Sequence, residues 1–243
     1  MTNGQLSGGE DMTTHQYQRA RKEGQKQQRR QAILDAAWAM YQTTPYEALA
    51  MASVAERVGL AKGTMYLYFA TKEELFLALT ERELFAWLAE VDAQLSEERP
   101  AWDIPAVVEI ACATLDAHPA LTRLLAILST VLEQNIDLET AIRFKRALLE
   151  RMLRTGALLE RRLPFLAPGD GLRTLTRCHA LVVGLRHLAD PAPIVREALR
   201  QPDLTLFNID FAAELRASVT ALLQGMRATA TTLESPSHAP DAS

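Results

Sequence analysis

With 243 residues, the chain is long enough for one large domain or two small ones, and its 48% of hydrophobic residues exclude global disorder. The formal net charge of −4 excludes a protein that coats nucleic acid over its whole surface, so any contact with DNA must be local. The two cysteines, Cys112 and Cys178, exclude a disulfide framework and a zinc-ligand spacing, which suits a reducing cytosol.

The sequence contains no apolar run of the roughly 18 residues that suggest a membrane span. Its N-terminus also lacks the apolar segment of a secretory signal. We therefore expect a soluble, cytoplasmic protein with no membrane partner. Whether translation starts at Met1 or at Met12 is not decided by the sequence.

Residues 1–28 are rich in Gly, Gln, Thr and charged residues and have almost nothing to bury, which predicts a mobile tail. Residues 231–243 are predicted to form a second, disordered tail. The first tail is basic toward its end, and this arm either touches the phosphates or the minor groove of DNA or is simply solvated. Its basic residues are Arg19, Arg21, Lys22, Lys26, Arg29 and Arg30, against the single acid Glu23.

Between the tails, the apolar residues follow a helical period. A first helix has one apolar face, made by Ile33, Leu34, Ala37, Trp38 and Tyr41. The sequence has no sustained alternation of period two and no Asn-Gly or Asp-Gly hairpin turn. Prolines and glycines divide the rest into roughly eight to ten helices. The predicted fold class is all-α, with a three-helix head over residues 29–76 and a larger helical bundle over residues 77–230.

The head contains the pattern of a helix-turn-helix. A short helix over about 51–57 leads into a turn at 58–60, and a second helix runs from about 61 or 62 to Phe69. Two helices that cross steeply need a small residue at the crossing and a residue that tolerates positive φ in the turn, and Ala55 and Gly59 supply both. The second helix of such a unit enters the major groove of DNA.

The next helix begins with a capping signal. Thr71-Lys72-Glu73-Glu74 matches the capping box, in which the Thr and Glu side chains bond to the exposed amides of the first turn. The apolar pattern that follows predicts a helix of about 24 residues, roughly 36 Å long, which can connect a DNA-binding head to a second module. Its apolar residues are Leu75, Phe76, Leu79, Leu84, Trp87, Leu88, Val91 and Leu95.

The segment AKGTMYLYFATKEEL at residues 61–75 resembles the recognition-helix segment of TetR-like transcriptional regulators, and VAERVGL at residues 54–60 resembles the segment before it. This resemblance covers about residues 30–76, and the rest of the chain resembles the family only in length, helicity and layout. It implies an all-helical homodimer that binds a palindromic operator in double-stranded DNA, with an effector and dimerisation domain in the C-terminal part.

The resemblance also implies roles for single residues. The positions of Tyr68 and Lys72 usually contact phosphates, and the positions that face the groove or its walls are those of Lys62, Gly63, Thr64, Tyr66 and Leu67. The chain departs from the family at residues 49–52, where the sequence Leu-Ala-Met-Ala replaces a frequent Thr and a charged residue. Ser53 or the basic arm is expected to compensate for the backbone contact that this departure weakens.

Two helices of the C-terminal part are expected to form the dimer interface. Residues 180–185 are apolar nearly all round, so that a partner subunit is expected to cover one side. The last helix, about 210–229, carries one apolar stripe. The predicted interface residues are Leu181, Val182, Gly184, Leu185, Phe211, Leu215, Val219, Leu222 and Met226.

The resemblance implies a small-molecule effector among the C-terminal helices, which must bind one state of the protein better than the other. We expect a lipophilic or aromatic compound, and no metal and no cofactor. The polar side chains among the apolar faces are candidate contacts, with an ordinary surface role as the alternative for each. They are Asn135, Arg143, Glu150, His179 and His187.

No catalytic constellation is visible in the sequence. Cys178 and His179 are adjacent, and adjacent helical residues point in different directions. We therefore expect a repressor that performs no chemistry. One alternative is a helical protein-interaction module without specific DNA binding, and another is a small-molecule enzyme on a helical scaffold. The operator, the target genes and the effector are not specified by the sequence.

Overall fold

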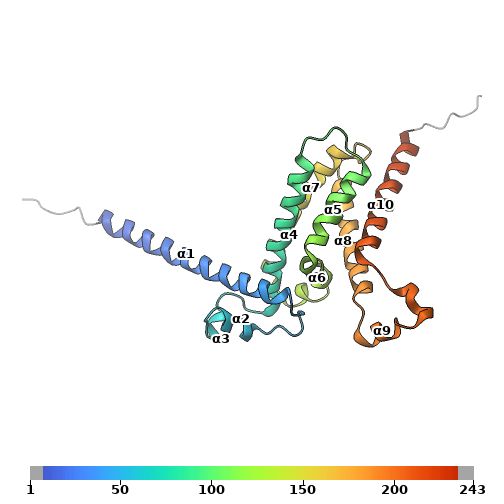
Figure 1. Ribbon diagram of the computed structural model, residues 1–243. Helices are drawn as coiled ribbons and strands as arrows, with labels where there is room; N and C mark the ends of the chain where they lie inside the picture. The colour runs from blue at the N-terminus through green and yellow to red at the C-terminus, as the bar shows by residue number, and fades with distance from the viewer. Residues whose placement is uncertain (1–7, 235–243) are drawn as a thin grey trace, which may run out of the picture. The chain divides into compact units, whose positions relative to one another are not determined.

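The computed structural model describes residues 8–234, and within them every regular element is helical (Figure 1). The predicted all-α fold class is confirmed. The α-helices are α1 (Gly8–Tyr41), α2 (Met51–Arg57), α3 (Lys62–Met65), α4 (Lys72–Ser96), α5 (Ile104–Ala117), α6 (Pro119–Leu128), α7 (Leu138–Arg162), α8 (Asp170–Ala189), α9 (Pro193–Ala198) and α10 (Phe211–Glu234). Two 3₁₀ helices are η1 (Leu132–Asn135) and η2 (Pro202–Phe207).

The chain forms two compact units, and α4 runs across the boundary between Leu75 and Phe76. In the N-terminal unit, the second half of α1 packs against α2, and α2 packs against α3. The apolar face predicted for α1 lies in this core, except that Trp38 is only half-buried. The core residues of the unit are Ile33, Leu34, Ala37, Tyr41, Leu49, Met51, Val54, Ala55, Met65, Phe69 and Leu75.

Helix α1 is much longer than the sequence predicted. Residues 8–28, assigned to a mobile tail, continue the helix that carries the core residues Ile33 to Tyr41. The physical reason is that helix extension adds one hydrogen bond for each residue once a nucleus exists, and Gln, Arg and Lys are good helix formers. At the other end, α10 includes residues 231–234, and the remainder of both predicted tails lies outside the described residues.

The C-terminal unit is a bundle in which α8 is the central helix. It packs against α6, α7 and α10, and α10 also packs against α5. Apolar side chains from α4, α5, α6, α7, α8 and α10 share one core. The buried residues of this core include Leu88, Leu95, Ile110, Leu121 and Leu159. The segment of residues 190–210, which contains α9 and η2, extends away from this bundle, and neither of its helices has a buried residue (Figure 1).

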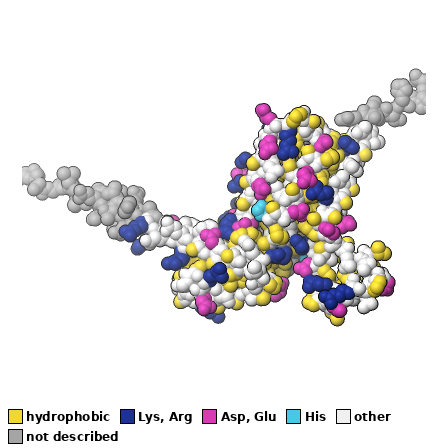
Figure 2. All heavy atoms as spheres, viewed as in Figure 1, with side chains coloured by type: hydrophobic (Ala, Val, Ile, Leu, Met, Phe, Trp, Pro, Cys, Tyr) yellow, Lys and Arg dark blue, Asp and Glu magenta, His cyan; other side chains and the backbone are white. Residues whose placement is uncertain are grey.

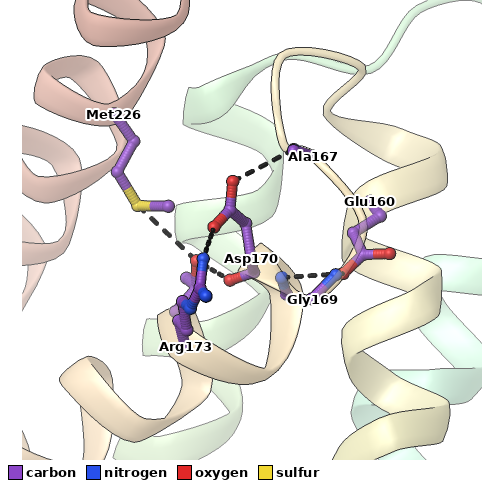
Figure 3. A network of polar contacts seen from close by, with 8 residues as sticks. Glu160, Ala167, Gly169, Asp170, Arg173 and Met226 are labelled. Atoms are coloured by element: carbon purple, nitrogen blue, oxygen red, sulfur yellow. Dashed lines mark hydrogen bonds and ion pairs between the residues drawn. The ribbon is translucent and has the colours of Figure 1, made fainter.

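Helices α7 and α8 approach each other at two glycines. A Cβ atom built on Gly171 would lie 2.1 Å from the backbone oxygen of Gly156, and one built on Gly156 would lie 2.8 Å from the backbone nitrogen of Leu172. Figure 3 shows the turn that follows, where a carboxylate oxygen of Glu160 accepts hydrogen bonds from the amides of Gly169 (2.8 Å) and Gly171 (2.9 Å). The close contact therefore depends on both residues being glycine.

Among residues 8–234, no individual helix is long and apolar enough to cross a membrane. The bent pair formed by Ile104–Ala117 and residues 119–127 passes a test of length and composition only, with an angle of 91° between its halves. In this structure the pair supplies core residues, among them Ile110, Leu121 and Leu124.

Candidate nucleic-acid interface and ligand cavity

The turn between α2 and α3 has the conformation that the sequence predicted. Gly59 has φ +66°, in the left-handed region, and a hydrogen bond of 2.9 Å from the Leu60 amide to the Ala55 carbonyl closes the turn. Ala55, at the predicted crossing of the helices, is 1% exposed. The positive φ of Gly59 is therefore confirmed, and its physical reason is that a side chain is strained in this region.

The second helix presents its tip to solvent. Met65 and Phe69 anchor the segment in the core of the N-terminal unit, with exposed fractions of 0% and 2%. Leu67, by contrast, is 77% exposed and Tyr66 is 44% exposed. Lys62 and Gly63 are exposed as well, and Thr64 is half-buried. Large apolar side chains held in solvent beside a lysine are typical of a recognition surface.

The segment after α3 continues as turns rather than as an α-helix. The regular helix ends at Met65, whereas the sequence predicted an end near Phe69. The amides of Tyr68 and Phe69 still donate to the Met65 carbonyl, at 3.0 and 3.2 Å. The backbone therefore stays compact as far as Phe69, which keeps Tyr66 and Leu67 in fixed positions.

Tyr68 lies beside the basic arm. A surface hollow in the N-terminal unit is lined by Tyr68 together with Lys22, Lys26 and Arg29 of α1, and its other lining residues are uncharged. A hydroxyl and three cations at one hollow are suited to bind phosphate oxygens. The structure thus brings together two features that the sequence suggested separately, because α1 extends through the region that was predicted to be a tail.

Lys72 is engaged inside the head. Its ammonium group donates a hydrogen bond to the Tyr46 carbonyl and lies 3.9 Å from the centroid of the Tyr46 ring. Burial lowers the pKa of Lys72 below its ordinary value. The Tyr46 hydroxyl donates to Glu73 at 3.1 Å, and burial followed by that hydrogen bond raises the pKa of Tyr46. A phosphate contact by Lys72 would have to compete with these interactions.

The first motif helix begins without a side-chain cap. Ala50 occupies the N-cap position of α2, and its methyl side chain cannot accept a hydrogen bond from the first turn of the helix. This agrees with the departure from the family pattern at residues 49–52. Ser53 is exposed in the first turn of α2. It remains a candidate for a backbone contact with DNA.

The cap of α4 contains the hydrogen bond to the Thr71 hydroxyl that the sequence predicted. The Thr71 hydroxyl accepts from the Glu74 amide at 3.0 Å, as the capping box requires. The Glu74 carboxylate accepts from the Ala70 amide at 2.9 Å. The two side chains still satisfy two amides that the helix leaves without a partner.

Thr71→Ala is expected to destabilise the protein by about 1 kcal/mol, because the Glu74 amide loses its acceptor. Urea unfolding followed by circular dichroism measures the loss. Thr71→Ser keeps the hydroxyl and should stay within a few tenths of a kcal/mol of the wild type. Equal destabilisation by the two variants would show that the hydroxyl does not act as the cap.

The C-terminal unit contains a cavity of about 280 Å³. Side chains from α4, α5, α6, α7, α8 and α10 line it, and most of them are apolar. Of the five predicted effector contacts, only His179 lies in this lining. Lys145, Thr155 and Cys178 also line the cavity and were not among the predicted contacts.

The other four predicted contacts lie elsewhere. Arg143 is exposed and pairs with Glu81 at 3.0 Å, while Asn135 and Glu150 are also exposed. His187 is exposed and its imidazole lies 3.2 Å from the Ala126 carbonyl. For Arg143 and Glu150 the reason is helical geometry, because these charged residues lie on the outward face of α7.

The structure buries three residues of the predicted dimer interface within the chain itself. Val182, Leu215 and Val219 are buried inside their own chain, with exposed fractions of 3%, 1% and 5%. Four more of the predicted residues pack partly against the same core: Leu181, Leu185, Phe211 and Met226. Leu222 is half-buried. Gly184 is exposed, and a Cβ atom built on it meets nothing within 4 Å. Three of the nine predicted residues therefore belong to the core of their own chain, and the other six keep part of their surface exposed.

Two family models match consecutive parts of the chain. Residues 33–79 match the model described as bacterial regulatory proteins, tetR family. Residues 81–230, more than half of the chain, match the model described as tetracyclin repressor-like, C-terminal domain. The chain belongs to the TetR family. The family suggested by the recognition-helix segment is thus confirmed, and the match extends through the C-terminal unit.

Relatives of this TetR-family protein match it over only part of its length. The HTH-type transcriptional repressor KstR of Rhodococcus jostii is 43% identical over 58 residues, which cover 24% of this chain and 27% of KstR. The chain spans about a quarter to a half of the length of the relatives that it matches.

Solved structures share the fold at low sequence identity. A TetR-family transcriptional regulator from Agrobacterium tumefaciens is 17% identical, with a TM-score of 0.51 over 82% of this chain and 98% of that one. The fatty acid degradation regulator FadR from Bacillus halodurans is 19% identical, with a TM-score of 0.51 over 81% and 95% of the two chains. At these identities the likeness extends to the fold alone.

Proposed function

We propose that this TetR-family protein is a sequence-specific DNA-binding transcriptional regulator that acts as a repressor. The observation that carries this proposal is the exposed tip of the helix-turn-helix, where Lys62, Gly63, Tyr66 and Leu67 stand in solvent on a segment anchored by Met65. Lysine donates to guanine or phosphate, and an apolar side chain contacts the methyl group of thymine. The family model and the likeness to the repressor KstR support the same reading.

We further propose that operator binding responds to a small molecule in the cavity of the C-terminal unit. The cavity is enclosed by six helices, including α4, which also begins in the head. A ligand there changes DNA binding only if it binds one state of the protein better than the other. No catalytic step is part of the proposal.

We also propose a homodimer, formed by α8 and α10 as predicted, with the exposed faces of these helices at the interface. The exposed side of α10 carries small residues at every fourth position, namely Ala213, Ala217, Ala221 and Gly225, and the exposed side of α8 carries Ala180 and Gly184. Small residues allow two helices to approach closely. The adjoining segment of residues 190–210 adds exposed apolar side chains (Figure 2), namely Ile194, Val195, Leu206 and Phe207.

Fluorescence anisotropy against DNA from upstream of the gene tests the DNA-binding proposal. Saturable binding that persists at physiological salt is expected. Lys62→Ala combined with Tyr66→Ala should lower the affinity by about a hundredfold, since each lost base or phosphate contact costs about 1–3 kcal/mol. Arg161→Ala removes one exposed cation from α7 and serves as the control, with no expected change.

Weak binding that is equal for any DNA and vanishes at physiological salt would contradict the proposal for this operator. Selection of binding sites from random DNA then separates an operator located elsewhere from a head that binds no specific sequence. The second outcome would favour the alternative of a protein-interaction module.

A further inference from the structure

The polar side chains of the cavity lining limit which ligands the cavity can bind. Eight residues with a polar or thiol group are found in the lining, among roughly twice as many apolar ones: Trp87, Cys112, Lys145, Thr155, Thr174, Thr176, Cys178 and His179. A volume of about 280 Å³ lies just below the range for small-molecule sites, which is about 300–1,000 Å³. A ligand of this site is therefore small and mostly apolar.

The indole and hydroxyl donors of the lining already have acceptors in the protein. The Trp87 indole donates to the Thr114 hydroxyl at 2.9 Å, and the Thr155 hydroxyl donates to Asp92 at 2.6 Å. The hydroxyls of Thr174 and Thr176 donate to backbone carbonyls of their own helix, at 2.8 and 3.0 Å. These groups have no donor left for a ligand.

The single charged side chain of the lining is also occupied. Lys145 pairs with Glu133 at 2.6 Å, and 57% of its side chain is exposed. A ligand carboxylate would have to leave water, enter an apolar cavity and displace Glu133 from this pair. Such a step is costly because a desolvated charge needs a partner of its own.

Among the nitrogen and oxygen groups of the cavity lining, the imidazole of His179 is the one without a hydrogen bond inside the described part of the chain. Its side chain is half-buried on α8, and within residues 8–234 its imidazole makes no hydrogen bond. Burial, followed by the nearby charge of Lys145, lowers the pKa of His179 below its ordinary value of 6.5. The imidazole is therefore neutral at pH 7.4, with one nitrogen that donates and one that accepts. The two thiols have pKa values raised by burial and are weak hydrogen-bonding groups.

We propose that the cavity binds an uncharged lipophilic molecule with one hydroxyl or carbonyl oxygen, which forms a hydrogen bond with the His179 imidazole. This inference deepens the proposed function, since it names the class of effector for the same cavity. The ligand fills the space among the aliphatic side chains and gives a hydrogen-bond partner to the His179 imidazole, which has none among residues 8–234. A carboxylate of the same length binds more weakly, because the one charged side chain of the lining, Lys145, is already paired with Glu133.

Isothermal titration calorimetry with 1-octanol and octanoate at pH 7.4 tests the inference on the full chain without DNA. These probes share one chain length and differ in charge. We expect 1-octanol to bind at least about ten times more tightly than octanoate. His179→Phe should weaken octanol binding by roughly three- to tenfold, which corresponds to one hydrogen bond. His187→Phe changes an exposed histidine of the same helix outside the lining, and it should leave the affinity unchanged.

Three outcomes would overturn the inference: octanoate that binds as tightly as octanol, no binding of octanol, or equal octanol affinity in the wild type and His179→Phe. Circular dichroism of each variant confirms that it is folded. The proposed function is tested separately, by operator affinity with and without octanol. If octanol binds through His179 and DNA binding does not respond, the ligand class stands and the regulatory role of the cavity fails.

Discussion

Gly171→Ala is expected to destabilise the C-terminal unit by about 3 kcal/mol. The added Cβ atom would lie 2.1 Å from the backbone oxygen of Gly156 and 2.5 Å from its carbonyl carbon. Backbone atoms of a packed helix cannot move aside as a flexible side chain can. Helices α7 and α8 must therefore separate, and both helices contribute side chains to the cavity lining.

Thermal unfolding followed by circular dichroism measures this effect, and a fall in Tm of roughly 6–12 °C is expected for a domain of this size. The matched control is Gly24→Ala in α1, where an added Cβ meets nothing within 4 Å. That substitution should be neutral or stabilise by up to about 1 kcal/mol, because alanine has the higher helix propensity. A Tm for Gly171→Ala equal to that of the wild type would show that α7 and α8 do not meet at these glycines.

Ala217→Glu combined with Ala221→Glu is expected to convert the protein into a monomer and to lower operator affinity by at least about a hundredfold. Both residues are exposed on the small-residue face of α10, so the monomer tolerates the longer side chains. In the proposed dimer, two carboxylates from each subunit would be buried without partners. The loss of affinity follows because two linked heads bind far more tightly than one.

Analytical ultracentrifugation at micromolar concentration gives the oligomeric state, and anisotropy gives the operator affinity. Ala157→Glu places the same side chain on an exposed position of α7, away from the proposed interface, and both measurements should match the wild type. A double variant that remains a dimer would exclude this face of α10. A wild-type protein that is a monomer would exclude the homodimer altogether.

Local signals were sufficient to predict the helix-turn-helix. The positive φ of Gly59 and the cap formed by Thr71 depend on residues within five positions of each other, so that the sequence itself contains both partners. The family assignment relied on the same short segments. The length of α1 was missed because the basic, polar residues 8–28 have no apolar face, and periodicity detects only helices that bury one side.

The sequence by itself determined the all-α class, the helix-turn-helix and the start of α4, since each of these depends on neighbours along the chain. Only the tertiary structure decided which faces of the helices meet. It directed Leu215 and Val219 into the chain's own core, left Ala217 and Ala221 outside, and brought His179 alone among the five polar candidates to the cavity. The contact of Gly156 with Gly171 has no local signal, because it arises where two separate helices cross.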